Sequence, residues 1–252
     1  MQKIGTGILC AILVATTVHG ARSEQASQPP IPDIVQRAAT AFGTSVHGVI
    51  GMQRHFTTVI RAGPIHHTEK SDSGFLMHDG SYVKIKYYRI ADDDHSFAAN
   101  EIDERDAQTN HAWEEGKVFF REPYDPRFMA EYRFEETPCE SCLADLVSVH
   151  FSSDLHDSQH GNGTMWIETA TAHVVRLTYA PNQLPPHATS GSVTETSTEA
   201  LTNLWYVTRI ESTYKGHAFV LRGSATFTAT FDRFQRFGKE DVAYEALQDG
   251  TI

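Results

Sequence analysis

The sequence has 252 residues, with 21 lysines and arginines against 32 aspartates and glutamates, which gives a net charge of −11 at pH 7. An acidic chain repels phosphate backbones and anionic membrane surfaces at long range, and no basic stripe with interleaved aromatic residues offsets this balance. Nucleic acid is therefore not an expected partner. The length suits one large domain that can bury a real core.

Residues 1–20 have the pattern of a secretory signal peptide. Lys3 supplies a positive start, Ile8–Val18 is an apolar run, and Val18-His19-Gly20 precedes a cleavage site before Ala21. The apolar run is too short to span a bilayer, and no later segment is long enough. We expect a soluble protein that is not transmembrane and is periplasmic or secreted. A lipid anchor on Cys10 is disfavoured, because Leu9 stands where a small residue is needed.

Two cysteines remain after the leader, Cys139 and Cys142, separated by Glu140 and Ser141. In an oxidising compartment, a disulfide between them is the favoured interpretation. A zinc site needs about four ligands, and no second cysteine pair is present. A redox dithiol has the same spacing but normally begins a helix in a βαβ unit, whereas strand-like segments flank this pair. A CxxC thiol oxidoreductase stays as an alternative, and we expect no cofactor.

One helix is predicted near the start of the mature chain. Residues 21–32 are small, polar or proline, which is typical of a flexible N-terminus. Pro32 and Asp33 suit the first turn of a helix. Apolar residues then recur at helical spacing from Ile34 to Phe42, and Gly43 ends the run. The helix has one apolar face, which needs a sheet to cover.

Strand patterns dominate from there to residue 237. The clearest is the alternation of Val83, Ile85 and Tyr87 with lysines, which follows the turn at Asp79-Gly80. The expected strand segments are 46–61, 73–90, 107–122, 146–151, 165–168, 174–179, 192–198, 204–214, 218–223 and 226–237. Within 107–122, Glu114-Glu115-Gly116 is interpreted as a turn. Residues 238–252 are weakly patterned and are expected to form a loose C-terminal tail.

Roughly nine to eleven strands follow from this pattern, and an open sheet of that size usually curls. The predicted fold is mainly β (α+β). A single domain over residues 33–237 forms a curved antiparallel sheet, a half-barrel, with the N-terminal helix against its concave face.

This order of elements resembles the periplasmic lipoprotein-carrier superfamily, the LolA/LolB-like outer-membrane lipoprotein-sorting proteins. The resemblance also rests on Ser73–Ile85 and on Gly163–Leu177, where an apolar strand, an acidic turn and a second apolar strand follow each other. It covers about residues 33–237 and implies a curved sheet whose concave face is plugged by helices. The single helix, the cysteine pair and Pro181–Pro186 depart from the family pattern. A lipid- or hydrophobe-binding relative is therefore a safer inference than a carrier of lipoproteins in particular.

The predicted helix is much shorter than the predicted sheet is wide, which indicates where a ligand could bind. A helix of about ten residues is about 15 Å long, whereas about ten strands spaced about 4.8 Å apart span nearly 50 Å before curling. We therefore expect an uncovered concavity that binds a lipid, acyl chain or other apolar ligand, with Ile85, Tyr87, Ile167 and Leu177 lining it. The prediction is a non-enzymatic exported carrier. The other alternative is a cell-envelope interaction module whose sheet is closed by a partner chain.

No pattern for catalysis or metal binding competes with this interpretation. His150, His156, Asp157 and His160 are close in sequence but are interpreted as solvated loop residues. The adjacent pair His66-His67 points to opposite faces of a strand. His160-Gly161-Asn162-Gly163 has no Gly-x-Ser-x-Gly partner, and no glycine-rich phosphate loop occurs.

Overall fold

The computed structural model describes residues 30–93, 95–115, 120–137, 145–218 and 221–252. The predicted signal peptide 1–20, nearly all of the flexible segment 21–32, and both Cys139 and Cys142 lie outside the described residues. The leader and the disulfide therefore stay predictions.

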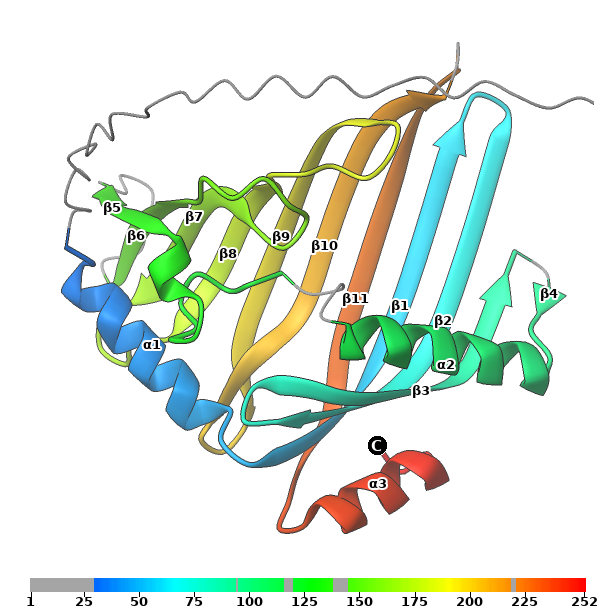
Figure 1. The fold of residues 1–252 in the computed structure, drawn as a ribbon, viewed down its shortest axis with the longest axis horizontal. Helices are drawn as coiled ribbons and strands as arrows, with labels where there is room; N and C mark the ends of the chain where they lie inside the picture. Colours follow the sequence, from blue (N-terminus) through cyan, green and yellow to red (C-terminus); the bar gives the residue numbers. More distant parts are fainter. Residues whose placement is uncertain (1–29, 94, 116–119, 138–144, 219–220) are drawn as a thin grey trace, which may run out of the picture.

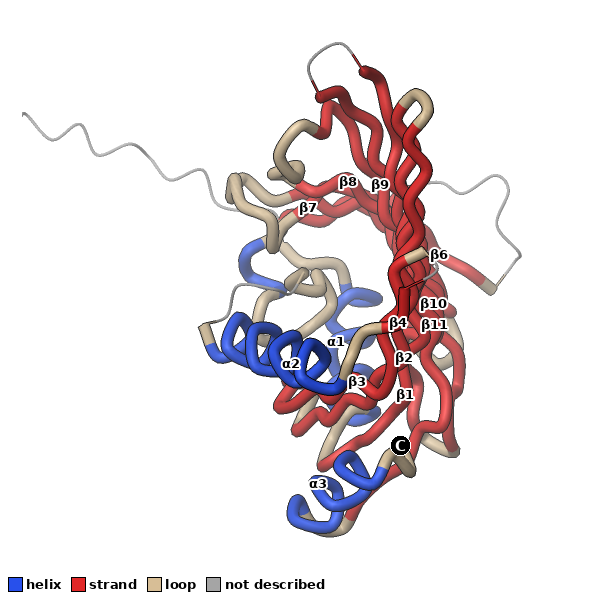
Figure 2. The backbone as a smooth tube through the Cα atoms, turned by 90° about the vertical axis from the view of Figure 1, so that its right-hand side faces the viewer, coloured by secondary structure: helices blue, strands red, loops and turns tan. Residues whose placement is uncertain are grey.

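One antiparallel sheet of eleven strands makes up most of the described chain. The strands are β1 (Val49–Ala62), β2 (Ile65–His78), β3 (Ser81–Asp92), β4 (His95–Ser96), β5 (Arg133–Thr137), β6 (Leu146–Ser152), β7 (Gly161–Glu168), β8 (Val174–Pro181), β9 (Ala188–Leu201), β10 (Leu204–Ala218) and β11 (Leu221–Phe237). Figure 2 shows the sheet curving around two helices on its concave side. The predicted fold class, an open half-barrel with a helix on its concave face, is confirmed.

The first and last long strands pair in the middle of this sheet. The strand order is β4-β3-β2-β1-β11-β10-β9-β8-β7-β6-β5, so that each half is a meander in which consecutive strands are neighbours. β1 pairs with β11 from Val49 opposite Phe237 to Ala62 opposite Gly223. The centre of the concave face is therefore built by strands from both ends of the domain.

Helix α1 (Asp33–Ser45) covers one end of the concave face, as predicted. Its buried residues Ile34, Val35 and Ala38 belong to a cluster with inward-facing residues of β5–β8, among them Ile167 and Leu177. The apolar stripe that identifies this helix in the sequence is thus the stripe that it buries.

Helix α2 (Ala99–Glu114) corrects the strand predicted from residue 107 onward. This helix begins with one half of a capping box: the Glu101 carboxylate accepts from the Ala98 N–H at 2.7 Å, and the methyl side chain of Ala98 offers no acceptor in return. Its one buried residue is polar: the Asn110 amide pairs with both the N–H and the C=O of Ile85, each at 3.0 Å. The Asp106 carboxylate accepts from the Tyr87 N–H at 2.7 Å. The helix therefore covers the backbone edge of β3. It lacks the apolar stripe by which a helix is recognised in a sequence.

Helix α3 (Glu240–Asp249) corrects the expected loose tail. Ala243 and Leu247, one turn apart, are buried against Leu76, which alternates with the inward-facing Phe75 and Met77 and so faces the opposite side of the sheet. Ile252 is fully buried beside them. Two residues of this helix are buried, which is too few to give a clear sequence pattern.

Glycine 74 makes room for the end of the chain. A Cβ at Gly74 would lie 2.2 Å from the Tyr88 hydroxyl and 2.7 Å from Leu247. That hydroxyl donates to the carbonyls of Leu247, at 3.1 Å, and of Ile252, at 2.5 Å.

Within the described part of the chain, no helix is long and apolar enough to cross a membrane.

Candidate functional site

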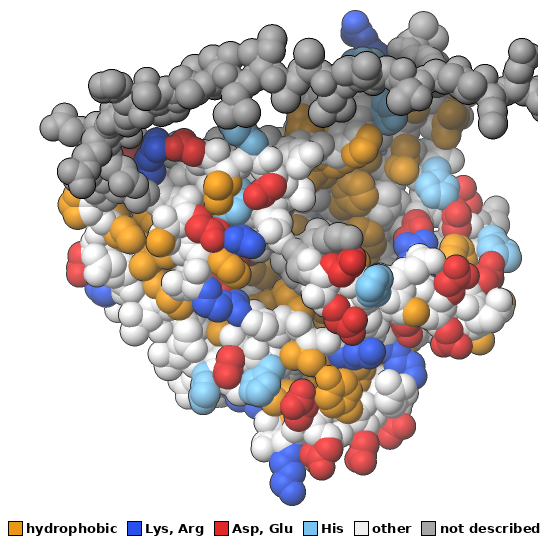
Figure 3. Space-filling view, in the orientation of Figure 1, with side chains coloured by type: hydrophobic (Ala, Val, Ile, Leu, Met, Phe, Trp, Pro, Cys, Tyr) orange, Lys and Arg blue, Asp and Glu red, His pale blue; other side chains and the backbone are white. Residues whose placement is uncertain are grey.

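A cavity of about 500 Å³ lies on the concave face, between α2, residues 120–122 and the central strands. Figure 3 shows hydrophobic side chains at the bottom of the hollow above α2. Ten of its lining residues are aromatic: Phe56, Phe75, Tyr82, Tyr87, Trp113, Phe120, Tyr179, Tyr214, Phe227 and Phe231. A volume of this size with largely aromatic walls and a few polar groups is typical of a small-molecule site.

The aromatic wall is held by ring contacts across several elements. Trp113 of α2 packs on Phe75 and Tyr82, with ring centroids 5.2 and 5.5 Å apart. On the other side, Phe120 stacks on Tyr179 at 3.8 Å. A Cβ at Gly163 of β7 would lie 2.7 Å from the Cβ of Tyr179, so the glycine lets β8 approach closely. Gly161 is equally close to β8, since a Cβ there would lie 2.8 Å from the Ala180 carbonyl oxygen, so packing explains both glycines of His160-Gly161-Asn162-Gly163.

Arg54 of β1 brings a positive charge into this aromatic surface. Its guanidinium carbon lies 4.7 Å from the ring centre of Phe75 and 5.0 Å from that of Phe56. One terminal nitrogen donates to the Tyr87 hydroxyl at 3.3 Å, and Nε is buried without a hydrogen-bond partner. No carboxylate of the described residues pairs with this guanidinium. Cation–π contacts with these rings therefore stabilise the guanidinium.

Two acids, Glu195 of β9 and Glu122, line the same cavity. Glu195 is 4 % exposed, and its Oε1 accepts from the Tyr179 hydroxyl at 3.3 Å. The second oxygen of each carboxyl is buried and accepts from no N–H or hydroxyl group of the described chain, and the two acids are hydrogen-bonded to each other. Burial raises the pKa of Glu122, and the neighbouring charge of Glu195 raises it further. Burial likewise raises the pKa of Glu195, to about 7. Burial and the repulsion between the two carboxylates therefore favour protonated forms of the pair.

Of the four residues predicted to line the concavity, the structure places one on the cavity wall. Tyr87 lines it, whereas Ile85, Ile167 and Leu177 are at most 1 % exposed and lie in packed clusters. Asn110 and α2 cover Ile85, and α1 covers the other two. Alternation therefore identified the inward face but not the part of that face left uncovered. Contact with a ligand stays a prediction for all four residues.

Sequence reasoning missed Arg54, Glu122 and Glu195. Glu195 occupies an inward position between Val193 and Ser197, both also buried, in a strand that is otherwise polar. Its cross-strand neighbours are Leu177 and Ile210. The available signal was the alternation itself, which places Val193, Glu195 and Ser197 on one face of β9.

His160 corrects the interpretation of that residue as a solvated loop histidine. It is 1 % exposed, with Nδ1 at 2.7 Å from an Asp157 oxygen and Nε2 at 2.7 Å from a Glu131 oxygen. Glu131 also accepts from Arg121 at 2.8 Å. Burial would raise the pKa of Glu131, but the hydrogen bonds from His160 and Arg121 outweigh it and hold that pKa below its usual value. His150 and His156 are exposed, and neither belongs to the one group with metal-ligand geometry among the described residues, His67, Asp92 and Asp93.

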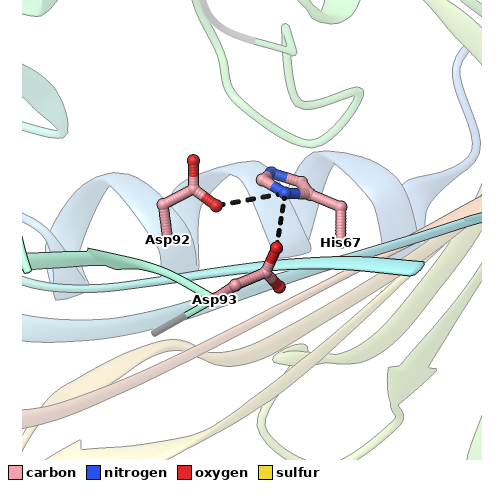
Figure 4. Close-up of side chains that lie close together, drawn as sticks. All are labelled: His67, Asp92 and Asp93. Atoms are coloured by element: carbon pink, nitrogen blue, oxygen red, sulfur yellow. Dashed lines mark hydrogen bonds and ion pairs between the residues drawn. The ribbon is translucent and has the colours of Figure 1, made fainter. Parts of the chain in front are cut away.

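A second histidine cluster lies at the far edge of the sheet. His67 Nδ1 lies 3.1 Å from Asp92 and 3.3 Å from Asp93, which Figure 4 shows. Asp93 also accepts from the Thr68 N–H at 2.8 Å, and this bond lowers its pKa. The hydrogen bonds within this partly exposed turn account for the arrangement, so it is not assigned a ligand.

Two larger grooves, of about 700 and 870 Å³, run along the outer side of α1. They share Gln36, Thr40 and Thr44 among their lining residues, which are largely small or polar. The concave cavity has the stronger claim as a functional site, because aromatic walls and unpartnered buried polar groups occur there together.

Comparison with known proteins found similar solved structures. No family model matches the chain, and no curated protein matches it. A domain from Vibrio parahaemolyticus assigned to outer membrane lipoprotein sorting is 10 % identical, with a TM-score of 0.44, over 86 % of this chain and 97 % of that chain. A DUF1329 family protein from Desulfovibrio piger is 10 % identical, with a TM-score of 0.39, over 85 % and 98 %.

A LolA superfamily protein from Nitrosomonas europaea is 6 % identical, with a TM-score of 0.38, over 82 % of this chain and 96 % of that chain. The structures that resemble this chain thus include a member of the superfamily that its sequence resembles.

Proposed function

We propose that the protein is an exported, periplasmic carrier that binds a lipid, an acyl chain or another apolar ligand in the concave cavity. The observation that supports this most directly is the cavity itself: about 500 Å³ of space remains on the concave face after α1 and α2 have packed. Its aromatic walls lie where a filled core would otherwise be.

The energetics favour an apolar occupant. Burying hydrocarbon contributes about 0.8 kcal/mol per CH₂ group, so a long alkyl chain has ample driving force even after the entropy of association is subtracted. Phe56 and Phe227, stacked at 6.2 Å, and the half-buried Ile210 offer apolar surface for such a chain.

Helix α2 is the element suited to admit the ligand. Arg105, Thr109 and Trp113 of α2 line the cavity. Asn110 is its one buried residue, and Ile102 and Trp113 are partly buried against the core, so this helix buries less apolar surface than the strands do. A helix with little buried apolar surface opens more easily than the strands beneath it. Movement of α2 away from Phe75 would widen the cavity without disturbing the sheet.

Binding of a fluorescent fatty-acid probe tests the proposal. We expect saturable binding by the wild type, and at least about tenfold weaker binding by Ile210→Asn, because an amide facing an alkyl chain loses its hydrogen bonds to water. Ile65→Asn is the matched control. Ile65 is 54 % exposed and lies outside the cavity, so this variant should bind as the wild type does.

Both variants must unfold cooperatively in denaturant for the comparison to hold. If the wild type binds the probe no better than a rigid β protein without a cavity, the carrier function is refuted. The interaction-module alternative, in which a partner chain occupies the concave face, then takes its place.

A further inference from the structure

Arg54 is a cation of the cavity wall with hydrogen-bond donors to spare. Its side chain is partly exposed on the inward face of β1 and lines the cavity. Nη2 donates to the Tyr87 hydroxyl at 3.3 Å, whereas Nη1 is not buried and donates to no oxygen of the described residues. Nε is buried, so the terminal nitrogens are the atoms that can meet a ligand.

Each acid of the described cavity wall is engaged elsewhere. Glu69 pairs with Arg105 of α2 at 3.6 Å. Glu195 and Glu122 are hydrogen-bonded to each other, and burial favours their protonated forms. Once these pairs are set aside, Arg54 carries the one charge of the described wall that no neighbouring group neutralises. The cavity therefore has a positive end at β1.

An apolar row of side chains leads away from this positive end. Phe56, the next inward residue of β1, lies opposite Ala229 of β11, and Ala229 lies opposite Ile210 of β10. All three line the cavity. Glu195 of β9 lies opposite Ile210, three strand spacings from β1, which is about 14 Å. A headgroup held at Arg54 thus leaves its hydrocarbon over apolar side chains and keeps its charge away from the acid pair.

We propose that Arg54 binds the carboxylate headgroup of a single-chain fatty acid, whose hydrocarbon lies along the row of Phe56, Ala229 and Ile210. This proposal rests on the carrier function above and names its ligand class. The planar guanidinium is a fork of N–H donors that matches the two oxygens of a carboxylate. One negative charge balances the one unmatched positive charge, whereas a phosphate monoester brings about −1.5 to −2.

The surroundings of Arg54 favour a tight ion pair. The ring centres of Phe75, Phe56 and Tyr87 lie 4.7, 5.0 and 5.7 Å from its guanidinium carbon. These rings displace water but bring no charge, so a carboxylate that arrives there is screened less than it would be on an open surface. The cavity volume of about 500 Å³ is in the range of sites for one small molecule, which favours one chain over a two-chain lipid.

Three decyl probes that differ only in their headgroup test the proposal: decanoate, decanol and decyl phosphate, each used at neutral pH below its aggregation concentration. Calorimetric titration should show the wild type binding decanoate at least about tenfold more tightly than decanol, as expected for a charge-assisted pair, and more tightly than decyl phosphate. In Arg54→Met this preference should disappear, while the affinity for decanol stays within about threefold. Arg54→Lys should keep part of the preference, because it retains the charge and loses the fork.

Arg61→Met is the matched control, since Arg61 is exposed on the same strand and lies outside this cavity, and its variant should keep the wild-type preference. Cooperative unfolding in urea verifies that each variant is folded. If Arg54→Met is not, Arg54→Lys decides, since loss of the fork alone must weaken the preference.

Equal affinities of the wild type for decanoate and decanol overturn the proposal, and so does an undiminished preference for decanoate in the Arg54 variants. Either result leaves the carrier function standing. Tighter binding of decyl phosphate than of decanoate overturns the assignment of a carboxylate. Failure of every probe, decanol included, refutes the carrier function and with it this inference.

Discussion

Glu195 and Glu122 stand where a β half-barrel would ordinarily place apolar side chains, and their protonation links the site to pH. Burial raises the pKa of both residues, that of Glu195 to about 7. The titratable groups that interact electrostatically with the pair are Tyr124 and Asp125, close to Glu122 in sequence, and the buried tyrosines Tyr82, Tyr132, Tyr179 and Tyr206. The charge of Arg54 acts on Tyr82.

The pair should destabilise the fold as pH rises. Between about pH 4.5 and 7 the folded protein holds protons that the unfolded chain releases, so the free energy of unfolding falls across this window. We expect Glu195→Gln to remove part of this fall, about 1–3 kcal/mol, and to be more stable than the wild type at pH 8. Urea unfolding at intervals from pH 5 to 8 measures the difference. Glu135→Gln should track the wild type, and parallel curves for Glu195→Gln would contradict the assignment.

His160 should be important for stability. Replacing it with alanine leaves the carboxylates of Glu131 and Asp157 without the donor that they share, and we expect a loss of about 2–4 kcal/mol in the free energy of unfolding. His156→Ala, in the same loop but exposed, should change stability by less than about 0.5 kcal/mol. Equal effects of the two substitutions would show that the buried hydrogen bonds of His160 contribute little.

At the residue scale, sequence reasoning identified which residues face the inside of the sheet but not which polar side chains contact one another there. Alternation marks Ile85 and Leu177 as buried, and both are. It gives no signal that His160 meets Glu131 or that Glu195 meets Glu122, because these contacts join segments far apart in the chain. A polar residue at an inward position is ambiguous until its partner is known.

The helices and strands also differ in whether the sequence predicts them. The strands and α1 bury apolar side chains at a fixed period, and the sequence predicts them. Helix α2 packs through Asn110 and Asp106 on backbone groups of β3, so its contacts leave no hydrophobic period. The meander from β1 to β3 would otherwise end in a long unpaired edge, which proteins commonly cover.

Asn110 should determine how firmly α2 is held. In Asn110→Ala the N–H and C=O of Ile85 lose their partners, and we expect the opening free energy of α2 to fall by about 1–2 kcal/mol. Hydrogen exchange should show faster exchange at Ile85 and along α2, with no change in β10 and β11. Asn100→Ala, in the first turn of the same helix and exposed, is the control. Uniform acceleration across the sheet would instead mean that α2 and the strands open together.

For the whole molecule, the sequence predicts roughly nine to eleven strands in a curved antiparallel sheet, and the described residues form eleven; it does not predict their order. Nor does it predict the placement of α3, because that placement depends on the space that Gly74 leaves and on Leu247 and Ile252 filling it. Neither Gly74 nor the pair Leu247 and Ile252 forms a recognisable sequence pattern by itself. Long-range fit of this kind is decided by shape and not by periodicity.

Export gives a prediction about the chain as a whole. Protein recovered from the periplasm should begin at Ala21 or within a few residues of it, with Cys139 and Cys142 oxidised to a disulfide. Intact-mass measurement before and after reduction and thiol alkylation checks both statements. An acylated Cys10, or two thiols that alkylate without reduction, would contradict them. The Cys139→Ser/Cys142→Ser variant should fold and bind probe normally, because the loop is small and its closure contributes little entropy.

The pairing of β1 with β11 also sets the order in which the molecule can fold. Val49 lies opposite Phe237. The edge of β1 that faces away from β2 therefore has no partner strand until nearly the whole domain has emerged. Contacts that distant in sequence form slowly, and the exposed strand edge meanwhile invites aggregation. A chain translocated from its N-terminus must therefore keep its first meander from pairing wrongly until the final strand arrives. Closure of this central seam is the step that we expect to limit the rate of folding.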